Sequence, residues 1–452
     1  MSKGRANGVT RGDLRRNARK ARLRVMVPAA NAVAGLDLGE KKQALVVTGL
    51  DGQVLARRSL RMTVHGLGAV LDWAEGKARA AGFAGLTVAC EPTGSRWMVV
   101  QELCAQRGLA MVCVQPLVSH VAREQQDLTG DKTDEGDCVL IARLARELHC
   151  YVPEKLEGVW ADLRELGRCR AQLITRGTAA KQLIRDKLGL AAPALLAAGS
   201  EPLDSATWLA GLEVVLARCG GDLAAAGAMG YEAFAAQATS RVGGWGGHRV
   251  GPTAKKLFAA LADPAEVAVP SRRAALRRAR HGLEDLKLAR ARRAEVEAEM
   301  TGLLDELGID HARICEIPGL TPAGLAAILA EAGDLRRYES SSSVVKHSGM
   351  SPARNESAAF HGKTRVSRRG RPALRLAVWR ATWAVLRHCD VLAVKHTALT
   401  SRDGEGKLAD AQARVACAAS LLRWIYALTV HGTRWDPRIA AGELGHHHAM
   451  AA

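Results

Sequence analysis

Residues 32–60 read AVAGLDLGEKKQALVVTGLDGQVLARRSL, and this stretch decides the fold of the N-terminal part of the chain. Its runs Ala32–Leu38, Gln43–Leu50 and Gln53–Leu60 are rich in residues that favour strands. Asp51-Gly52, between the second run and the third, is a strong signal for a tight hairpin turn. The stretch therefore predicts three consecutive strands joined as a meander.

The pattern after this meander alternates between helix and strand. Helices are expected over about 64–81 and 95–107, and strands over Leu86–Cys90 and Leu109–Val114. Two more helices are expected over about 117–125 and 135–149. Three strands as a meander, followed by alternating helices and strands, is the order of the ribonuclease H-like fold, which we predict for residues 31–150.

The rest of the chain is predicted to be mostly helical. A basic arm over 1–30 precedes the α/β part, and a helical linker follows over 151–307. Within the linker, Ala161–Leu188 and Arg272–Leu307 are long, charged and periodic, which predicts an antiparallel coiled coil. Residues of about 190–270 between them read as an inserted segment of helices and loops. A small, mostly helical domain is expected over 308–435, and a tail over 436–452.

Composition limits the classes of function. The 452 residues include 64 Lys and Arg against 46 Asp and Glu, a formal net charge of +18. This excess predicts a polyanionic partner, with nucleic acid ahead of a membrane surface. Aromatic residues make up only 4%, which argues against a protein that binds single strands mainly by base stacking. No apolar run reaches the roughly 18 residues of a membrane span, so we expect no membrane partner. The 10 cysteines are scattered without zinc-ligand spacing, and we expect a cytoplasmic protein.

Four acidic residues mark a candidate catalytic site in the α/β part. Asp37 lies near the end of the first predicted strand, and Glu91 directly follows the fourth. Asp134 and Asp137 open the last predicted helix, and their spacing puts both on one face of it. In a ribonuclease H-like sheet the first and fourth strands are neighbours and the last helix packs across them, so the four carboxylates are expected to converge.

Converging carboxylates predict a metal site. Carboxylate oxygens are the ligands that Mg²⁺ or Mn²⁺ prefers, and two such ions roughly 4 Å apart can clamp both oxygens of a phosphodiester displacement. Without a metal, clustered carboxylates raise one another's pKa values. Each acid alone has a simpler reading: Asp134 as a helix cap, Asp37 as a turn residue, Glu91 as a solvated loop acid. Asp131 and Glu135 are nearby alternatives as ligands.

These residues resemble those of the insertion sequence 110 family of bacterial transposases, which carry a RuvC-like Asp-Glu-Asp-Asp domain. The likeness in the N-terminal part lies in Asp37, in Glu91-Pro92-Thr93-Gly94, and in Lys132-Thr133-Asp134 with Asp137. The family's small C-terminal transposase domain is similar to three further stretches: Ile317–Asp334, His347–Pro352 and Val366–Arg375. The resemblance covers roughly 31–150 and 308–390, in the family's order.

The resemblance implies a mechanism that the acids alone do not. Family members are recombinases in which a serine of the C-terminal domain attacks a DNA phosphodiester and forms a phosphoserine intermediate. Counted back from Ser367-Arg368-Arg369-Gly370, the family's nucleophile position falls on Ser357, with Ser367 as the alternative. Ala358 and Ala359 follow Ser357 where the family usually has glycines.

The resemblance also implies the partners, which are donor and target DNA, a structured bridge RNA that guides the choice of sequence, and further copies of the chain in a homodimer or homotetramer. A guide RNA fits the absence of any base-reading module from the sequence. Two basic stretches are candidates for contacting the nucleic-acid backbone. The first is Arg272, Arg273, Arg277 and Arg278 at the start of a long helix, and the second is Lys363, Arg365, Arg368, Arg369, Arg371 and Arg375. The alternative interpretation of the first stretch is a solvated helix face. Two alternatives stay open: a RuvC-like nuclease without a serine step, and a non-catalytic nucleic-acid-binding derivative.

Overall fold

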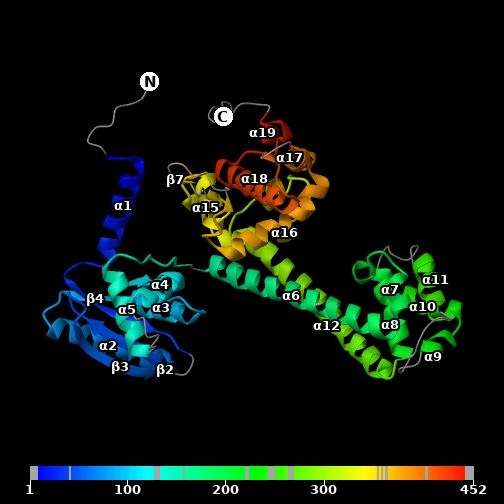
Figure 1. Cartoon of the computed structure of the whole chain (residues 1–452), viewed down its shortest axis with the longest axis horizontal. Coiled ribbons are helices and arrows are strands. Elements are labelled where there is room, and N and C mark those ends of the chain that lie inside the picture. The colour runs from blue at the N-terminus through cyan, green and yellow to red at the C-terminus, as the bar shows by residue number, and fades with distance from the viewer. Residues whose placement is uncertain are drawn as a thin grey trace. The chain divides into compact units, whose positions relative to one another are not determined.

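In the computed structural model the chain folds into two compact units, Met1–Leu156 and Glu157–Ala452 (Figure 1). The structure describes residues 9–39, 42–126, 133–155, 158–218, 223–242, 250–262, 269–353, 356–357, 360–361, 365–402 and 406–442. The boundary between the units falls close to the predicted end of the α/β part.

A mixed sheet forms the centre of the first unit and confirms the predicted strands. They are β1 (Asn31–Asp37), β2 (Lys42–Thr48), β3 (Val54–Arg61), β4 (Gly85–Cys90) and β5 (Ala110–Cys113), in the order β3-β2-β1-β4-β5. β1 pairs antiparallel with β2, and β2 with β3, whereas β1 pairs parallel with β4, and β4 with β5. This arrangement is compatible with the predicted ribonuclease H-like fold.

Helices cover both faces of this sheet. They are α1 (Arg11–Met26), α2 (Val64–Ala80), α3 (Arg96–Gln106), α4 (Pro116–Gln126) and α5 (Asp134–Arg146). Alternation along β1 assigns its side chains to the two faces, since successive residues of a strand point in opposite directions. Leu36 is buried in the core that α2 and α3 close, and Val33 in the core that contains residues of α5. Asp37 follows the alternation of Val33 and so belongs to the α5 face.

Within the predicted basic arm over 1–30, residues 11–26 form the helix α1, which was not predicted. Thr10 caps this helix by accepting a hydrogen bond from the Asp13 backbone N–H. Leu23 and Val27 are buried, and Arg19 Nη2 donates to the Cys150 carbonyl at 3.2 Å. Thr87 Oγ1 also donates to the Met26 carbonyl at 3.0 Å, so apolar contacts and hydrogen bonds together dock a segment whose sequence shows mainly positive charge. Residues 1–8 lie outside the described residues.

The second unit contains the predicted antiparallel coiled coil. Helices α6 (Val159–Ala191) and α12 (Arg272–Glu306) pack along each other. Arg170 Nε donates to Glu297 Oε1 at 2.8 Å near one end, and Arg272 Nε donates to the Ala191 carbonyl at 2.9 Å at the other. Because residue numbers rise along α6 as they fall along α12, the two helices run in opposite directions.

The segment between these helices is a helical insertion, as predicted. It comprises α7 (Pro193–Ala197), η1 (Pro202–Asp204), α8 (Ala206–Arg218), α9 (Leu223–Gly227), α10 (Tyr231–Arg241) and α11 (Val250–Ala260). Trp208, Phe234 and Leu257 are buried in a core that the insertion shares with the ends of α6 and α12. The glycine-rich run at 243–247 lies outside the described residues.

The C-terminal part is mostly helical, as predicted. Its helices are α13 (His311–Ile314), α14 (Pro322–Ala332), η3 (Leu335–Arg337), α15 (Ser341–Ser348), α16 (Pro372–His388), α17 (Asp390–Thr400), α18 (Asp410–His431) and α19 (Pro437–Ala441). Short strands β6 (Pro352–Ala353), β7 (Glu356–Ser357), β8 (Phe360–His361) and β9 (Arg365–Val366) lie between α15 and α16. α19 falls within the predicted tail.

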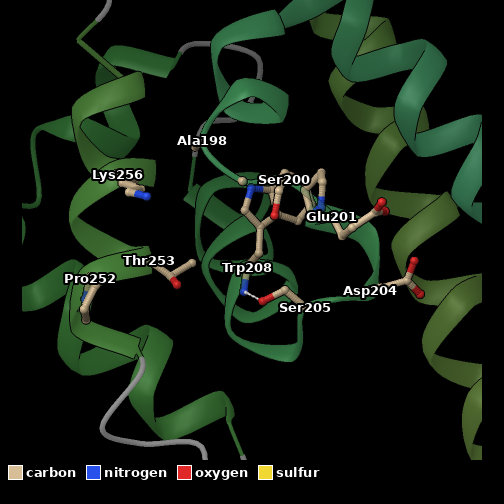
Figure 2. A pocket seen from close by; sticks show the side chains of 11 residues that line it. Ala198, Ser200, Glu201, Asp204, Ser205, Trp208, Pro252, Thr253 and Lys256 are labelled. Carbon is tan, nitrogen blue, oxygen red and sulfur yellow. Dashed lines mark hydrogen bonds between the residues drawn. The ribbon is translucent and has the colours of Figure 1, made fainter. Parts of the chain in front are cut away.

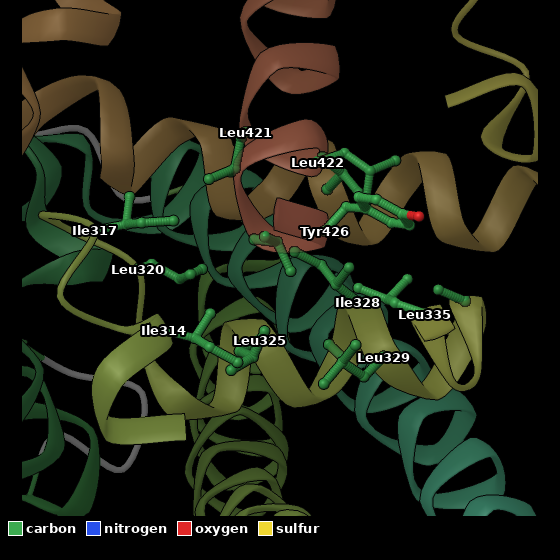
Figure 3. Packing of buried hydrophobic residues seen from close by; sticks show 14 of the residues in the cluster. Ile314, Ile317, Leu320, Leu325, Ile328, Leu329, Leu335, Leu421, Leu422 and Tyr426 are labelled. Atoms are coloured by element: carbon green, nitrogen blue, oxygen red, sulfur yellow. The ribbon is translucent and has the colours of Figure 1, made fainter. Parts of the chain in front are cut away.

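Burial explains the strong hydrophobicity of two helices in this part. Ile328 and Leu329 of α14 pack with Leu421, Leu422 and Tyr426 of α18 in one core (Figure 3). α18 is long and apolar enough to cross a membrane by composition alone, yet 56% of its most apolar window is buried inside the protein. Its apolar residues thus serve the core, which makes the helix weak evidence for a membrane span.

Candidate active site

The sheet brings the first two predicted acids together. Leu36 of β1 is paired in parallel register with Cys90 of β4. Asp37 and Glu91 are the next residues along these neighbouring strands, so they lie side by side where the strands end. The carboxyl ends of parallel strands are where ligand sites form in α/β sheets.

Helix α5 carries the other two acids and lies very close to β1. Thr133 caps its start by accepting a hydrogen bond from the Gly136 N–H at 3.1 Å, which places Asp134 and Asp137 in the first turn. A Cβ atom at Gly35 would lie 1.9 Å from the carbonyl oxygen of Cys138. The Cys138 thiol donates to the Ala44 carbonyl at 3.0 Å and ties α5 to β2. Only glycine at position 35 lets α5 lie this close to the sheet.

The environment of Cys138 shows that three of the acids share one region. Burial raises the pKa of this thiol to about 12. The negative charges of Asp37, Asp137 and Asp134 act in the same direction, while a hydrogen bond to the Asp37 backbone opposes them. Cys138 therefore lies within electrostatic reach of all three carboxylates.

Helix α4 supplies hydrogen-bond partners to two of the acids, and these partners were not predicted from the sequence. Ser119 Oγ donates to Glu91 Oε2 at 2.6 Å. Arg123 donates to Asp137 Oδ1 through Nε at 2.8 Å and through Nη2 at 2.6 Å. The one signal available in the sequence was a hydroxyl and a guanidinium spaced four residues apart on the helix before the acidic one.

Glu135, one of the two nearby alternatives, points away from the group. Glu135 Oε2 accepts from Arg57 Nη1 at 2.5 Å, an exposed pair that directs this carboxylate toward β3. Asp131 lies outside the described residues.

The acids gather at one end of the sheet without forming a complete metal cluster. Across the described part of the chain, no group of three or more His, Cys, Asp or Glu side chains is placed to hold a metal ion. The donor chemistry still fits a hard divalent cation, because all four candidates offer carboxylate oxygens. Among the described residues, Asp137 already meets one positive charge, the Arg123 guanidinium.

The two candidate nucleophiles lie in the strand region of the C-terminal part. Ser357 belongs to β7 and is paired with Phe360 of β8; its side chain and residues 358–359 lie outside the described part. Ser367 is held by hydrogen bonds: its N–H donates to the Ser351 carbonyl at 2.9 Å, and its Oγ donates to the Gly349 carbonyl at 3.2 Å.

The basic stretch after Ser357 divides into inward and outward residues. Arg371 Nε donates to Glu331 Oε2 at 2.6 Å, and Arg375 Nη1 donates to the Ser348 carbonyl at 2.9 Å, so both guanidinium groups serve the fold. Arg365, Arg368 and Arg369 are exposed, whereas Lys363 lies outside the described residues. On α12, Arg272 bonds to the end of α6, and Arg273, Arg277 and Arg278 are exposed.

A charged cluster lies beneath this stretch. Glu331 is buried and pairs with Arg371, and the His347 ring lies 5.5 Å from the ring of Tyr338. Burial lowers the pKa of His347 to about 4, and the neighbouring cations Arg371, Arg337 and Arg164 add to the effect. His347 is therefore neutral at physiological pH.

A hollow of about 460 Å³ lies in the insertion. Ser200, Trp208, Thr253 and Lys256 are among the residues that line it (Figure 2). None of the predicted site residues lines it, so the hollow adds nothing to the candidate active site.

Comparison with known proteins identifies the two regions that hold these candidates. Residues 34–193 match a family model described as "Transposase", of the DEDD type. Residues 311–396 match a second model, described as "Transposase IS116/IS110/IS902 family". The first match contains all four acids, and the second contains both serines and the basic stretch. No curated protein matches the chain.

Proposed function

We propose that this chain, an IS110/IS116-family transposase by both of its matched regions, cuts and rejoins DNA with a divalent-metal site of four carboxylates and a serine nucleophile. The family match makes it a DNA transposase or recombinase. The metal, the serine step and a guide RNA are our proposals.

One observation supports the proposal above the others. Asp37 and Glu91 end neighbouring parallel strands, and α5 brings Asp134 and Asp137 to the same face within the region that matches the DEDD model. Acids far apart in the sequence are thus gathered at one end of the sheet. A fold that only bound nucleic acid would gain nothing from negative charge gathered there, because it would repel phosphate.

Asp37, Glu91, Asp134 and Asp137 would hold the cation, Mg²⁺ or Mn²⁺. When bound, such ions stabilise the negative charge that develops on the attacking and leaving oxygens of a phosphodiester. The protein contributes the positions of its carboxylates, which the β1–β4 register and the close packing of α5 determine.

Ser357 is the proposed nucleophile. Its Oγ forms a bond to phosphorus, the bond from phosphorus to the leaving strand oxygen breaks, and the serine proton ends on the hydroxyl of that strand. Rejoining reverses these steps with a new strand. Ser367 is the weaker candidate because its hydroxyl donates to the Gly349 carbonyl within the fold.

The exposed arginines are the proposed contacts to DNA and RNA backbones. Arg273, Arg277 and Arg278 on α12, with Arg365, Arg368 and Arg369 near the serines, present positive charge to solvent. Sequence choice would come from base pairing to a guide RNA, and a homodimer or homotetramer would let the acids of one copy serve the serine of another.

The test combines the full-length chain with supercoiled donor and target DNA, Mg²⁺ and the non-coding RNA that flanks its gene. We expect protein–DNA adducts in which DNA is attached to Ser357, located by mass spectrometry after nuclease digestion. Ser357→Ala should abolish the adduct, and Ser367→Ala is the matched control that should retain it. Asp37→Ala or Asp134→Ala should abolish cleavage but leave RNA binding largely intact.

Other outcomes would overturn parts of this proposal. Cleavage that survives Ser357→Ala and Ser367→Ala indicates a nuclease without a serine step. Binding without cleavage under every condition indicates a non-catalytic derivative. Unchanged cleavage in Asp37→Ala would refute the metal assignment.

A further inference from the structure

Helix α4 lies against the acidic group and contacts it with one face. Ser119 and Arg123 are four residues apart, which places both on the same side of the helix. Ser119 reaches Glu91, and Arg123 reaches Asp137, so one helix touches an acid from the sheet and an acid from α5. The family resemblance that identified the acids includes neither of these two residues.

The Ser119 hydroxyl is committed to the Glu91 carboxylate. Ser119 is 2% exposed, and its Oγ lies 2.6 Å from Glu91 Oε2 and 3.0 Å from the Pro116 carbonyl. A hydroxyl has one proton, and the shorter contact, to the Glu91 carboxyl oxygen, is the stronger one. This bond engages Oε2 and restricts the rotation of the carboxylate about its last torsion angle.

Arg123 meets its partner differently, because it brings charge. Two of its N–H groups point at the same oxygen, Asp137 Oδ1, and the side chains of Arg123 and Asp137 are 29% and 10% exposed. The guanidinium thus neutralises the most buried of the four acids. A divalent cation that approaches this carboxylate has to compete with a positive charge already there.

We infer that α4 presets the acidic site for its cation: Ser119 is a positioning residue that orients Glu91, and Arg123 is a counter-cation that a divalent metal displaces from Asp137. The inference rests on the metal site of the proposed function. It makes two predictions of opposite sign. Loss of the serine hydroxyl should weaken metal binding, and loss of the arginine charge should strengthen it.

The expected sizes follow from general behaviour of metal sites. Removing a group that orients a ligand typically costs about 10- to 100-fold in metal affinity, and a hydroxyl on one of four carboxylates should fall at the low end. Removing a nearby positive charge relieves repulsion of the incoming ion, but solvent screens a partly exposed guanidinium, so we expect roughly three- to tenfold tighter binding.

The test titrates MnCl₂ into the full-length chain without nucleic acid, with heat and the Mn²⁺ electron paramagnetic resonance signal as readouts. Ser119→Ala should bind Mn²⁺ about tenfold more weakly, and Ser119→Thr, which keeps the hydroxyl, should recover most of the loss. Arg123→Gln should bind more tightly, and Arg123→Lys, which keeps the charge, should resemble the parent. Circular dichroism before each titration selects folded protein.

The control is a solvent-exposed pair on the same helix, about 100° around it from Ser119 and Arg123. His120 and Glu124 form a pair with side chains 61% and 67% exposed, so His120→Gln and Glu124→Gln should leave Mn²⁺ affinity unchanged. Parent-like binding in both Ser119→Ala and Arg123→Gln, or a change of the same sign in both, would overturn the inference while the metal site stands. A parent chain that binds no Mn²⁺ more tightly than its Asp37→Asn variant would overturn the metal site and this inference together.

Discussion

The packing of α5 against β1 is the feature of the candidate site that a single methyl group tests most directly. In Gly35→Ala the added Cβ would lie 1.9 Å from the carbonyl oxygen of Cys138, 2.8 Å from its carbonyl carbon and 3.1 Å from the Ala142 nitrogen. These atoms belong to the helix backbone, so no side chain can rotate away to make room.

The magnitude follows from the distance that α5 must move. Ordinary contacts begin near 3.5 Å, so the helix has to retreat by about 1.5 Å. That shift strains the Cys138 bond to the Ala44 carbonyl, 3.0 Å in the native protein, and separates Asp134 and Asp137 from Asp37. Overpacking by one methyl group usually costs about 1–3 kcal/mol, and a backbone obstacle should bring the cost to at least about 3 kcal/mol. For a unit of this size the melting temperature should fall by roughly 6–12 °C.

Two assays read this change. Calorimetry of the full-length chain should show the lower melting temperature, and mass spectrometry after brief alkylation should show faster labelling of Cys138, which is fully buried in the parent. Gly76→Ala is the control: Gly76 lies inside α2, a Cβ there meets nothing within 4 Å, and the change should stabilise the helix by about 0.5–1 kcal/mol. Parent-like melting and Cys138 protection in Gly35→Ala would refute the reasoning.

Three further predictions concern the C-terminal part. Arg371→Leu removes the guanidinium that pairs with the Glu331 carboxylate, whose side chain is 7% exposed, and should lower the free energy of unfolding in urea by about 3–5 kcal/mol. Adding Glu331→Gln to this variant should restore most of the lost stability. A double variant as unstable as Arg371→Leu would contradict the pairing. The pKa of His347 is about 4 in the folded protein against an ordinary value of 6.5, so between these values the unfolded chain binds more protons and the free energy of unfolding should decline as the pH is lowered. Unfolding midpoints measured at pH 7 and pH 5 should show this decline, and His347→Gln should reduce it. An equal decline in the variant would exclude His347 as its source. Replacing the exposed Arg368 and Arg369 together by alanine should leave the free energy of unfolding unchanged. The slope of log affinity for DNA against log salt concentration should become shallower by the amount expected for roughly two phosphate contacts. An unchanged slope would show that these arginines do not contact the DNA.

Most of the α/β architecture could be predicted because its signals are local. Strands can be predicted from residue composition and from turn residues such as Asp51-Gly52. The order of the strands in the sheet then follows from the rules of sheet topology. The acids were identifiable for the same reason, since Asp37, Glu91 and Asp134 stand at the ends of predicted elements. Helix α1 was missed because its contacts with the unit come mainly from Leu23 and Val27, too few apolar residues to dominate a strongly basic segment.

The sequence by itself determined which residues carry charge and chemistry and where along the strands and helices they stand. Only the tertiary structure decided which way those side chains point and what they meet. Arg371 and Arg369 look alike as letters in a basic run, yet one is held by Glu331 and the other faces solvent. Ser119 and Arg123 acquire a role only because α4 lies against residues 28 and 14 positions away in the sequence. The physical reason is that periodicity encodes burial within one element, whereas a hydrogen bond or ion pair depends on the distance between two elements that folding alone brings together.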